Sequence, residues 1–279
     1  MNLTKFLRRD SVEVAVGATK IGGSNPIAVQ SMTNTATADV TASVAQIERI
    51  ADAGAPIVRL TAQGIKEGEA FAQIMPALRG DGYDTAIVAD IHFVPEIAAI
   101  AAESVDKVRI NPGNFVDPGR TFRQLEYTDE EYAAEIKKIE AALVPFLQLC
   151  REHGTAVRIG VNHGSLSDRI MSRYGDTPAG MVESAMEFLR VCVAQDFTQV
   201  VISIKASNTV IMVETVRRLV KAMEAEGMDF PLHLGVTEAA ISNVVKGKSD
   251  FAEENLIKIL NNPNGWDTSM LMESEPEPA

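Results

Sequence analysis

The chain has few cysteines, and they are not clustered. Only two of its 279 residues are cysteine, Cys150 and Cys192, and neither belongs to a CxxC pair. This spacing excludes the usual disulfide scaffolds and zinc clusters. We therefore expect both thiols to be buried in a protein of a reducing compartment.

Long apolar runs and net positive charge are also lacking. No 18 uncharged apolar residues follow one another, and the basic start MNLTKFLRRD has no apolar segment behind it. We thus expect no membrane span and no signal peptide, and predict a cytoplasmic protein. The net charge of −12 argues against nucleic acid as a partner, because phosphate backbones require a basic face. Any anion site in this chain must be local.

Strand-like runs and helical patterns alternate along the chain. Apolar residues three or four apart predict helices at Val40–Ala51, Tyr132–Cys150, Met181–Gln195 and Val210–Glu226. Strand-like runs that end in polar or glycine residues are PIAVQSMT (26–33), PIVRLTAQ (56–63), TAIVADIHF (85–93), DKVRINPGN (106–114), TAVRIGVNHGS (155–165), QVVISIKASN (199–208) and LHLGVTEA (232–239). This alternation predicts a parallel sheet with helical crossovers.

The distribution of polar residues distinguishes between two parallel architectures. They follow every strand rather than one switch point, which favours a TIM-type (β/α)₈ barrel over a doubly wound sheet. We assign residues 1–239 to this barrel. The period-two segment SVEVAVGATKIGG (11–23) predicts a hairpin over its amino-terminal mouth. The eighth strand is missing or atypical, because 240–279 contains a divergent stretch, one predicted helix (FAEENLIKIL) and the acidic tail ESEPEPA.

Three strands carry an arginine inside an apolar run: Arg59, Arg109 and Arg158 are the middle residues of VRL, VRI and VRI. Because side chains alternate along a strand, apolar neighbours that face the helices place these arginines in the barrel interior. The same alternation predicts a set of further inward polar residues, followed by Glu238 at the rim. The set is Thr61, Asp90, His92, Asn111, Asn162, Lys205, Ser207, His233 and Thr237.

Cations gathered in this way require anions, since an uncompensated buried ion costs several kcal/mol. Asp90 and Glu238 are the evident internal counter-charges, which leaves about two positive charges over from Lys205 and the three arginines. A diphosphate fits that surplus, because planar guanidinium groups match phosphate oxygens. In the alternative, each arginine pairs with a helix carboxylate or stabilises the amino-terminal end of its strand.

Other strand-end residues suggest further chemistry. Glu238 is a candidate acid or base, because a nearby phosphate favours its protonated form; its alternative is an ion pair with Lys205 or Arg158. His92 is either a proton or hydrogen-bond donor or a core histidine. The candidate ligands of a metal site lack helical spacing, which disfavours such a site. They are Asp90, His92, His163 and His233.

Six motifs occur in the order found in one known family: PIAVQSMTNT, VADIHF, VRINPGN, RIGVNHGSLSDRIMSRYGDTP, ISIKASN and LHLGVTEA. Over about residues 10–239 the chain resembles the amino-terminal barrel of 4-hydroxy-3-methylbut-2-enyl diphosphate synthases. The resemblance implies reductive ring opening of 2-C-methyl-D-erythritol 2,4-cyclodiphosphate in isoprenoid biosynthesis, with Glu238 as catalytic proton donor. Together with the inward set, it gives the expected substrate-binding residues. These are Arg59, Asp90, His92, Arg109, Asn111, Arg158, Asn162, Lys205 and Ser207.

The resemblance also implies ferredoxin or flavodoxin as electron donor, and a [4Fe-4S] cluster that three cysteines and a glutamate ligate on a separate domain. No cysteine follows Cys192, so we expect this chain alone neither to bind the cluster nor to perform the reduction. A truncated product, an isolated domain and half of a split enzyme all remain open, as does a homodimer. Two further hypotheses are a dihydropteroate synthase-like phosphate or pterin barrel and a non-catalytic phosphate-binding remnant.

Overall fold

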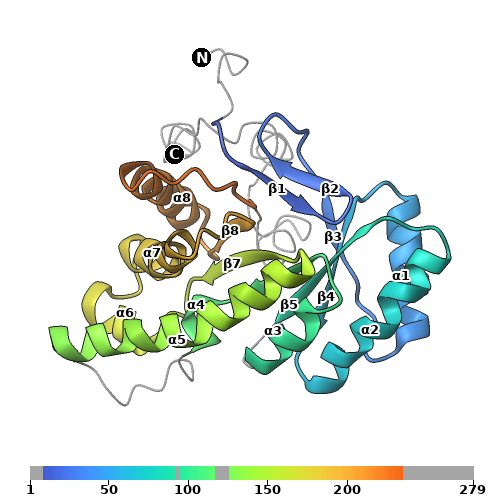
Figure 1. Ribbon diagram of the computed structural model, residues 1–279. Coiled ribbons are helices and arrows are strands. Elements are labelled where there is room, and N and C mark those ends of the chain that lie inside the picture. The colour runs from blue at the N-terminus through green and yellow to red at the C-terminus, as the bar shows by residue number, and fades with distance from the viewer. Residues whose placement is uncertain (1–8, 92–94, 117–125, 235–279) are drawn as a thin grey trace, which may run out of the picture.

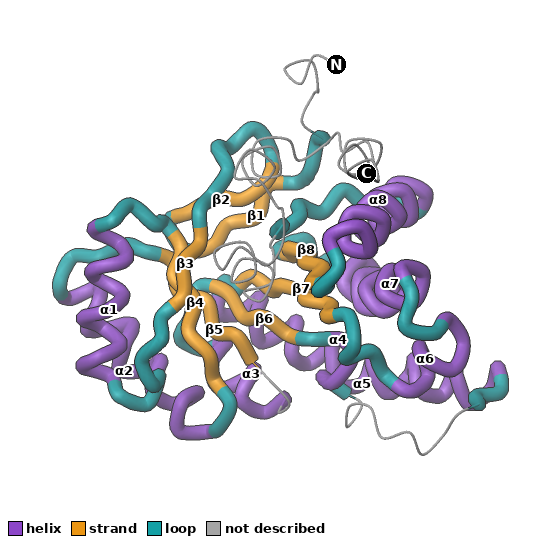
Figure 2. Tube along the Cα trace, turned by 180° about the vertical axis from the view of Figure 1, so that it is seen from behind, coloured by secondary structure: helices purple, strands orange, loops and turns teal. Residues whose placement is uncertain are grey.

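The computed structural model describes residues 9–91, 95–116 and 126–234, in which six parallel strands form a curled sheet in chain order (Figure 1). The helices lie on the outer side of the curl (Figure 2). The predicted TIM-type barrel is therefore confirmed as a half-barrel within this part of the chain. Its strands are β3 (Gln30–Met32), β4 (Ile57–Ala62), β5 (Ala86–Ile91), β6 (Lys107–Ile110), β7 (Ala156–Asn162) and β8 (Val200–Lys205).

Helices connect the strands, and their ends follow the capping residues. Asp39 accepts a hydrogen bond from the amide of Ala42 at the start of α1, a Thr128–Glu131 capping box begins α5, and Gly154 ends α5 with a φ of 69°. The four predicted helices correspond to α1, α5, α7 and α8. The bounds are α1 (Val40–Asp52), α2 (Ile65–Gly80), α3 (Pro95–Ala102), α4 (Pro112–Phe115), α5 (Asp129–His153), α6 (Asp168–Tyr174), α7 (Pro178–Ala194) and α8 (Thr209–Ala225).

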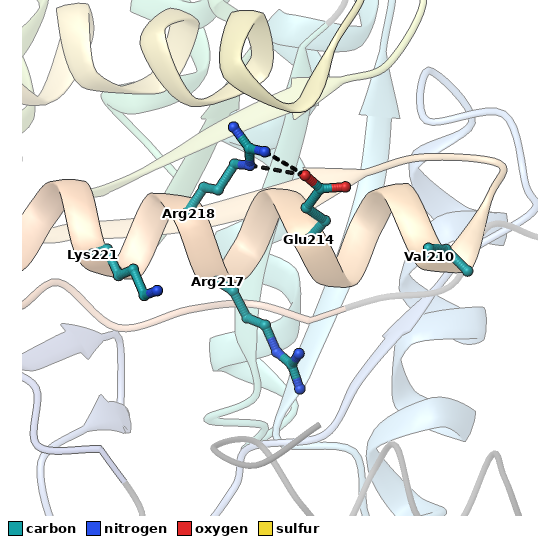
Figure 3. A pocket seen from close by; sticks show the side chains of 5 residues that line it. All are labelled: Val210, Glu214, Arg217, Arg218 and Lys221. Carbon is teal, nitrogen blue, oxygen red and sulfur yellow. Dashed lines mark hydrogen bonds and ion pairs between the residues drawn. The ribbon is translucent and has the colours of Figure 1, made fainter. Parts of the chain in front are cut away.

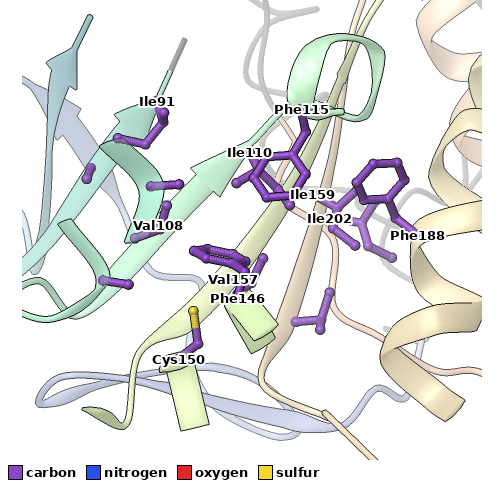
Figure 4. Packing of buried hydrophobic residues seen from close by; sticks show 14 of the residues in the cluster. Ile91, Val108, Ile110, Phe115, Phe146, Cys150, Val157, Ile159, Phe188 and Ile202 are labelled. Carbon is purple, nitrogen blue, oxygen red and sulfur yellow. The ribbon is translucent and has the colours of Figure 1, made fainter. Parts of the chain in front are cut away.

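Alternating side chains give the sheet two separate apolar layers. The outer layer packs against the helices: strand residues such as Val108 and Ile159 meet Phe115, Phe146 and Phe188 (Figure 4). Both cysteines belong to this layer, which confirms the prediction that the thiols are buried. Burial raises the pKa of each thiol to about 12. The inner layer lies at the beginnings of the strands and consists of Val14, Val16, Ile57, Ala86, Val88, Ala156 and Val201.

A hairpin closes the amino-terminal end of the half-barrel. Strand β1 (Glu13–Val16) pairs antiparallel with β2 (Thr19–Gly22), and both Val14 and Val16 are fully buried in the inner layer. The amide of Ala15 donates to the side-chain oxygen of Gln199, just before β8, at 2.9 Å. This confirms the hairpin predicted for 11–23 and gives the interior an apolar floor.

Pairing continues beyond β8. Leu232 forms a parallel bridge with Ile202, and the amide of His233 donates to the Ile202 carbonyl at 2.7 Å. The predicted run 232–239 thus begins beside β8 as expected. His92, Thr237, Glu238 and the features predicted for 240–279 lie outside the described residues. Among the helices that the structure describes, none is long and apolar enough to cross a membrane.

A buried ion pair holds α6 against its neighbours. Arg169 of α6 pairs with Glu187 of α7, and Glu187 also accepts a hydrogen bond from the hydroxyl of Tyr132 in α5. Burial raises the pKa of Glu187, against the opposing effect of Arg169. Three helices are therefore joined at one point next to the segment that follows β7.

Candidate functional site: a buried arginine layer

The arginines of β4, β6 and β7 converge on one carboxylate inside the curl. Strand register aligns Asp90 with Arg109 and Arg109 with Arg158. Asp90 Oδ1 lies 3.3 Å from Arg109 Nη1 and 3.9 Å from Arg158 Nη2, and its Oδ2 lies 3.4 Å from Arg59 Nε. The structure thus brings together four residues that alternation along the strands predicted to face inward. We refer to Arg59, Asp90, Arg109 and Arg158 as the arginine layer.

This layer is buried except for Arg59, which is half-buried, and it carries unsatisfied hydrogen-bond donors. Arg109 and Arg158 are each 3% exposed. Burial lowers the pKa of both, that of Arg158 to about 9, although Asp90 acts in the opposite direction. The Nε atoms of Arg109 and Arg158 are buried without a hydrogen-bond partner among the described residues, and Arg59 Nε has only its ion pair with Asp90. Because buried donors are normally paired, these guanidinium groups are suited to an anionic ligand.

Gly160 of β7 makes room for Arg109. Its carbonyl accepts a hydrogen bond from Arg109 Nη2 at 2.9 Å. A β-carbon at this position would lie 2.4 Å from Arg109 Nε and 3.1 Å from Ser203 Oγ. The guanidinium therefore lies directly over a glycine, and a larger residue there would displace it.

We expect Gly160→Ala to weaken anion binding by about tenfold while the chain stays folded, because the added methyl group pushes the Arg109 fork away from Asp90. Calorimetric titration with the ligand proposed below measures this loss. Gly80→Ala is the matched control, since nothing lies within 4 Å of a β-carbon at Gly80. Equal affinities of the two variants would show that Arg109 need not occupy this position.

Asn111 is committed to local structure. Its Oδ1 accepts from the amide of Gly113 at the start of α4, and its Nδ2 donates to Ser165 Oγ at 2.9 Å. It therefore ties the end of β6 to the loop after β7. The predicted ligand role of Asn111 remains a proposal. A ligand could use only the second N–H of its Nδ2 and the second acceptor site of its Oδ1.

Close contact between the same two loops depends on Gly113. A β-carbon there would lie 1.7 Å from the carbonyl oxygen of Ser165, a backbone atom that cannot rotate away. We expect Gly113→Ala to destabilise the chain by about 1–3 kcal/mol, as other overpacked substitutions do. Urea unfolding measures the change, again against Gly80→Ala, and an unchanged midpoint would contradict the expected clash.

The remaining predicted residues lie nearer the rim. Asn162 and Lys205 are aligned at the carboxyl ends of β7 and β8. Asn162 is half-buried, whereas Lys205 and Ser207 are exposed. His163 lies beside Asp176 instead, with its Nε2 3.4 Å from Asp176 Oδ1. The inward residues therefore form two groups, the buried arginine layer and a more exposed rim. The alternation of side chains along a strand does not distinguish these groups.

His233 joins the buried layer from the segment after α8. Its Nε2 lies 3.4 Å from Arg158 Nη1. Burial, and then the charges of Arg158, Lys107 and Arg59, lower the pKa of His233 well below its usual value. The ring is therefore neutral at physiological pH and can accept a hydrogen bond from Arg158.

Lys107 of β6 is a further inward cation, which is absent from the set of inward residues predicted from the sequence. It is fully buried, and its Nζ has no hydrogen-bond partner among the described residues. Burial, and then the charges of Arg158 and Arg59, lower its pKa to about 7. The available signal was its position two residues before Arg109, which places both side chains on the same face of β6.

The described residues contain no group of three or more histidine, cysteine, aspartate or glutamate residues that could hold a metal ion. The two cysteines of the chain lie buried in α5 and α7, with raised thiol pKa values that disfavour the thiolate. They do not fit an iron–sulfur cluster.

A hollow of about 410 Å³ lies on α8 (Figure 3). It is on the face of the helix opposite the buried Met212 and Leu219, and two of its lining side chains, Glu214 and Arg218, pair with each other. No residue of the arginine layer lines this hollow. Its lining residues are Val210, Glu214, Arg217, Arg218 and Lys221.

Known proteins are similar to this chain over most of its length. The family model described as GcpE TIM-barrel domain matches residues 11–258. A 4-hydroxy-3-methylbut-2-en-1-yl diphosphate synthase (flavodoxin) of Phocaeicola vulgatus is 66% identical over 239 residues, 86% of this chain and 39% of that protein. The chloroplastic ferredoxin-type synthase of Arabidopsis thaliana is 50% identical over 238 residues, 85% of this chain and 32% of that protein.

The chain thus spans less than two fifths of the length of these relatives. Among solved structures, a type I 3-dehydroquinate dehydratase of Clostridium difficile matches with a TM-score of 0.49 and 10% identity, covering 81% of each chain. From the family match and the identity to its relatives, the chain belongs to the family of the GcpE TIM-barrel domain, the barrel of 4-hydroxy-3-methylbut-2-en-1-yl diphosphate synthases.

Proposed function

We propose that this chain is the substrate-binding barrel of a 4-hydroxy-3-methylbut-2-en-1-yl diphosphate synthase of isoprenoid biosynthesis, with the domain at residues 1–239 and a divergent segment at 240–279. Its ligand is 2-C-methyl-D-erythritol 2,4-cyclodiphosphate, whose diphosphate lies against the arginine layer. The observation that carries this proposal is the excess of three guanidinium groups over one carboxylate within the layer, together with the buried Nε atoms of Arg109 and Arg158, which have no hydrogen-bond partner among the described residues.

The arginine layer supplies binding and charge stabilisation for the ring opening. When the bond between the carbon skeleton and the diphosphate oxygen breaks, negative charge develops on that oxygen. Guanidinium groups that are already fixed by Asp90 and the Gly160 carbonyl stabilise this charge without reorganising. The same groups orient the substrate and exclude water from its phosphates.

The rim residues and two residues outside the described part complete the proposed site. Lys205, Asn162 and Ser207 lie where the carboxyl ends of β7 and β8 meet bulk solvent, so they can contact the exposed side of the ligand. We assign His92 as a hydrogen-bond donor and Glu238 as the proton donor to the reacting carbon. These two roles rest on the resemblance of VADIHF and LHLGVTEA to the family motifs.

Electrons are proposed to come from flavodoxin or ferredoxin, which the names of the relatives contain. In this family a [4Fe-4S] cluster would pass them to the substrate, but the two buried cysteines here do not fit its ligand set. The chain on its own is therefore proposed to bind the substrate without converting it.

Calorimetric titration of the purified chain with the cyclodiphosphate tests the proposal. We expect micromolar binding at a stoichiometry of about one, which weakens with salt because the contacts are ionic. Arg190→Ala keeps full affinity as a control, since Arg190 pairs with Glu183 and Glu226 on the helical surface. A chain that circular dichroism shows to be folded, but that binds no cyclodiphosphate, would refute the proposed function.

A further inference from the structure

Lys107 lies between the apolar floor and the arginine layer. On neighbouring strands, its register partners are Val88 and Ala156, both members of the inner apolar layer. Two residues further along β6, Arg109 is aligned with Asp90 and Arg158. The residues that pair with Lys107 across the sheet are therefore both apolar. The charged groups lie two residues further along the strands, above the amino group of Lys107.

The charges around Lys107 are mostly positive. Arg158 and Arg59 disfavour its protonated form, and Asp106, the residue just before β6, favours it. Its own charge in turn acts on His233. Asp90 is already paired with the three arginines. A buried Nζ without a hydrogen-bond partner in this setting is poorly stabilised as an ammonium ion.

We infer that Lys107 is a further, buried cation of the anion site and that its side chain takes up one proton from solvent as the anion binds. This inference rests on the proposed binding of a diphosphate at the arginine layer. Binding converts the neutral amine into an ammonium ion, with a proton supplied by the buffer. Lys107 need not touch the ligand, because the added negative charge acts across the short distance between two levels of the sheet.

Electrostatics explains why the anion would reverse the preference of the amine. The free layer presents two nearby guanidinium charges to Lys107, whereas a doubly charged diphosphate above them cancels that field. The pKa of about 7 in the free chain lies close enough to neutrality for this change to move a whole proton. Protonation of Lys107 would thereby add one positive charge to the site only when the anion is bound.

Calorimetry in pairs of buffers of different ionisation enthalpy, such as Tris and HEPES at pH 8 and Bis-Tris and MES at pH 6, measures the number of protons taken up on binding. At pH 8 we expect wild-type chain to take up close to one proton per cyclodiphosphate bound, and at pH 6 close to none, because the lysine is then already charged. Affinity should be about fivefold weaker at pH 8 than at pH 7. The ligand contributes no proton, since each phosphorus of a cyclic diphosphate carries one strongly acidic hydroxyl.

Three variants assign the proton. Lys107→Met should bind with little proton uptake and without the pH dependence, whereas Lys221→Met, on the exposed face of α8, should behave as wild type. His233→Gln should retain the uptake. Uptake that persists in Lys107→Met, or disappears only in His233→Gln, would overturn the role of Lys107. Wild-type binding without proton uptake would overturn this inference alone, whereas absence of binding by the folded wild-type chain would remove the proposed function as well.

Discussion

Replacing Arg109 by alanine is expected to weaken binding of the cyclodiphosphate by about a hundredfold or more. Arg109 is the most constrained member of the arginine layer, because it contacts both Asp90 and the Gly160 carbonyl from a buried position. The truncation removes its donors and leaves Asp90 with two guanidinium partners instead of three. Loss of one partner from a buried charged network typically costs about 2–5 kcal/mol.

Calorimetric titration of Arg109→Ala and wild type at the same salt concentration measures this effect. Arg190→Ala is the matched control, because it removes the same side chain from an exposed ion-pair network. The control should differ from wild type by less than about threefold. A similarly small change in a folded Arg109→Ala chain would show that the layer is a structural network and not an anion site.

Replacing Lys107 by methionine is expected to stabilise the free chain by several kcal/mol at pH 7. Methionine fills a similar volume beside Val88 and Ala156 and carries no group that must be hydrated. The lysine pKa falls from 10.5 to about 7 on folding, and each unit corresponds to about 1.4 kcal/mol. A residue that opposes folding in this way is a common feature of binding sites.

The stabilisation should depend on pH with a definite sign. Between pH 7 and 10.5 the unfolded lysine binds more protons than the folded one, so wild-type stability rises with pH through this window. The advantage of Lys107→Met is therefore largest at or below pH 7 and decreases toward pH 10. Urea unfolding of both chains at pH 7 and 9.5 measures it, with Lys221→Met as control. A Lys107→Met chain less stable than wild type at pH 7 would contradict the expected desolvation.

Much of the arginine layer could be predicted because a strand's alternation is a local property. Once Val58 and Leu60 are taken to face the helices, Arg59 must face inward, and the same holds for Arg109 and Arg158. The hairpin at 11–23 was predictable for the same reason. These features require only neighbours in sequence.

Depth within the sheet could not be predicted, since it depends on register between strands. The inward direction of Lys107 follows from alternation, but its depth does not, because nothing in its run shows that Val88 and Ala156 are its partners. Gly160 was missed because its role depends on Arg109, which reaches it from another strand. Register also explains why Lys205 lies exposed at the rim although it shares its inward direction with the buried arginines.

Helix α2 was not predicted because of its composition. It contains Gly68 and Pro76, two residues that normally interrupt a helix. A β-carbon at Gly68 would lie 3.1 Å from Ile97 of α3, so close packing between the two helices explains the glycine. Tertiary contacts here outweigh the low local propensity.

The four residues of β6 alternate between the two sides of the sheet, with Lys107 and Arg109 inside and Val108 and Ile110 outside. A shift of this strand by one residue in register would exchange both sides at once. Two cations would then meet the aromatic residues of the helices, and two aliphatic side chains would occupy the place of the anion. Point substitutions can therefore alter this strand one position at a time, whereas a register shift of one residue inverts all four positions together, which constrains how the strand can change in evolution.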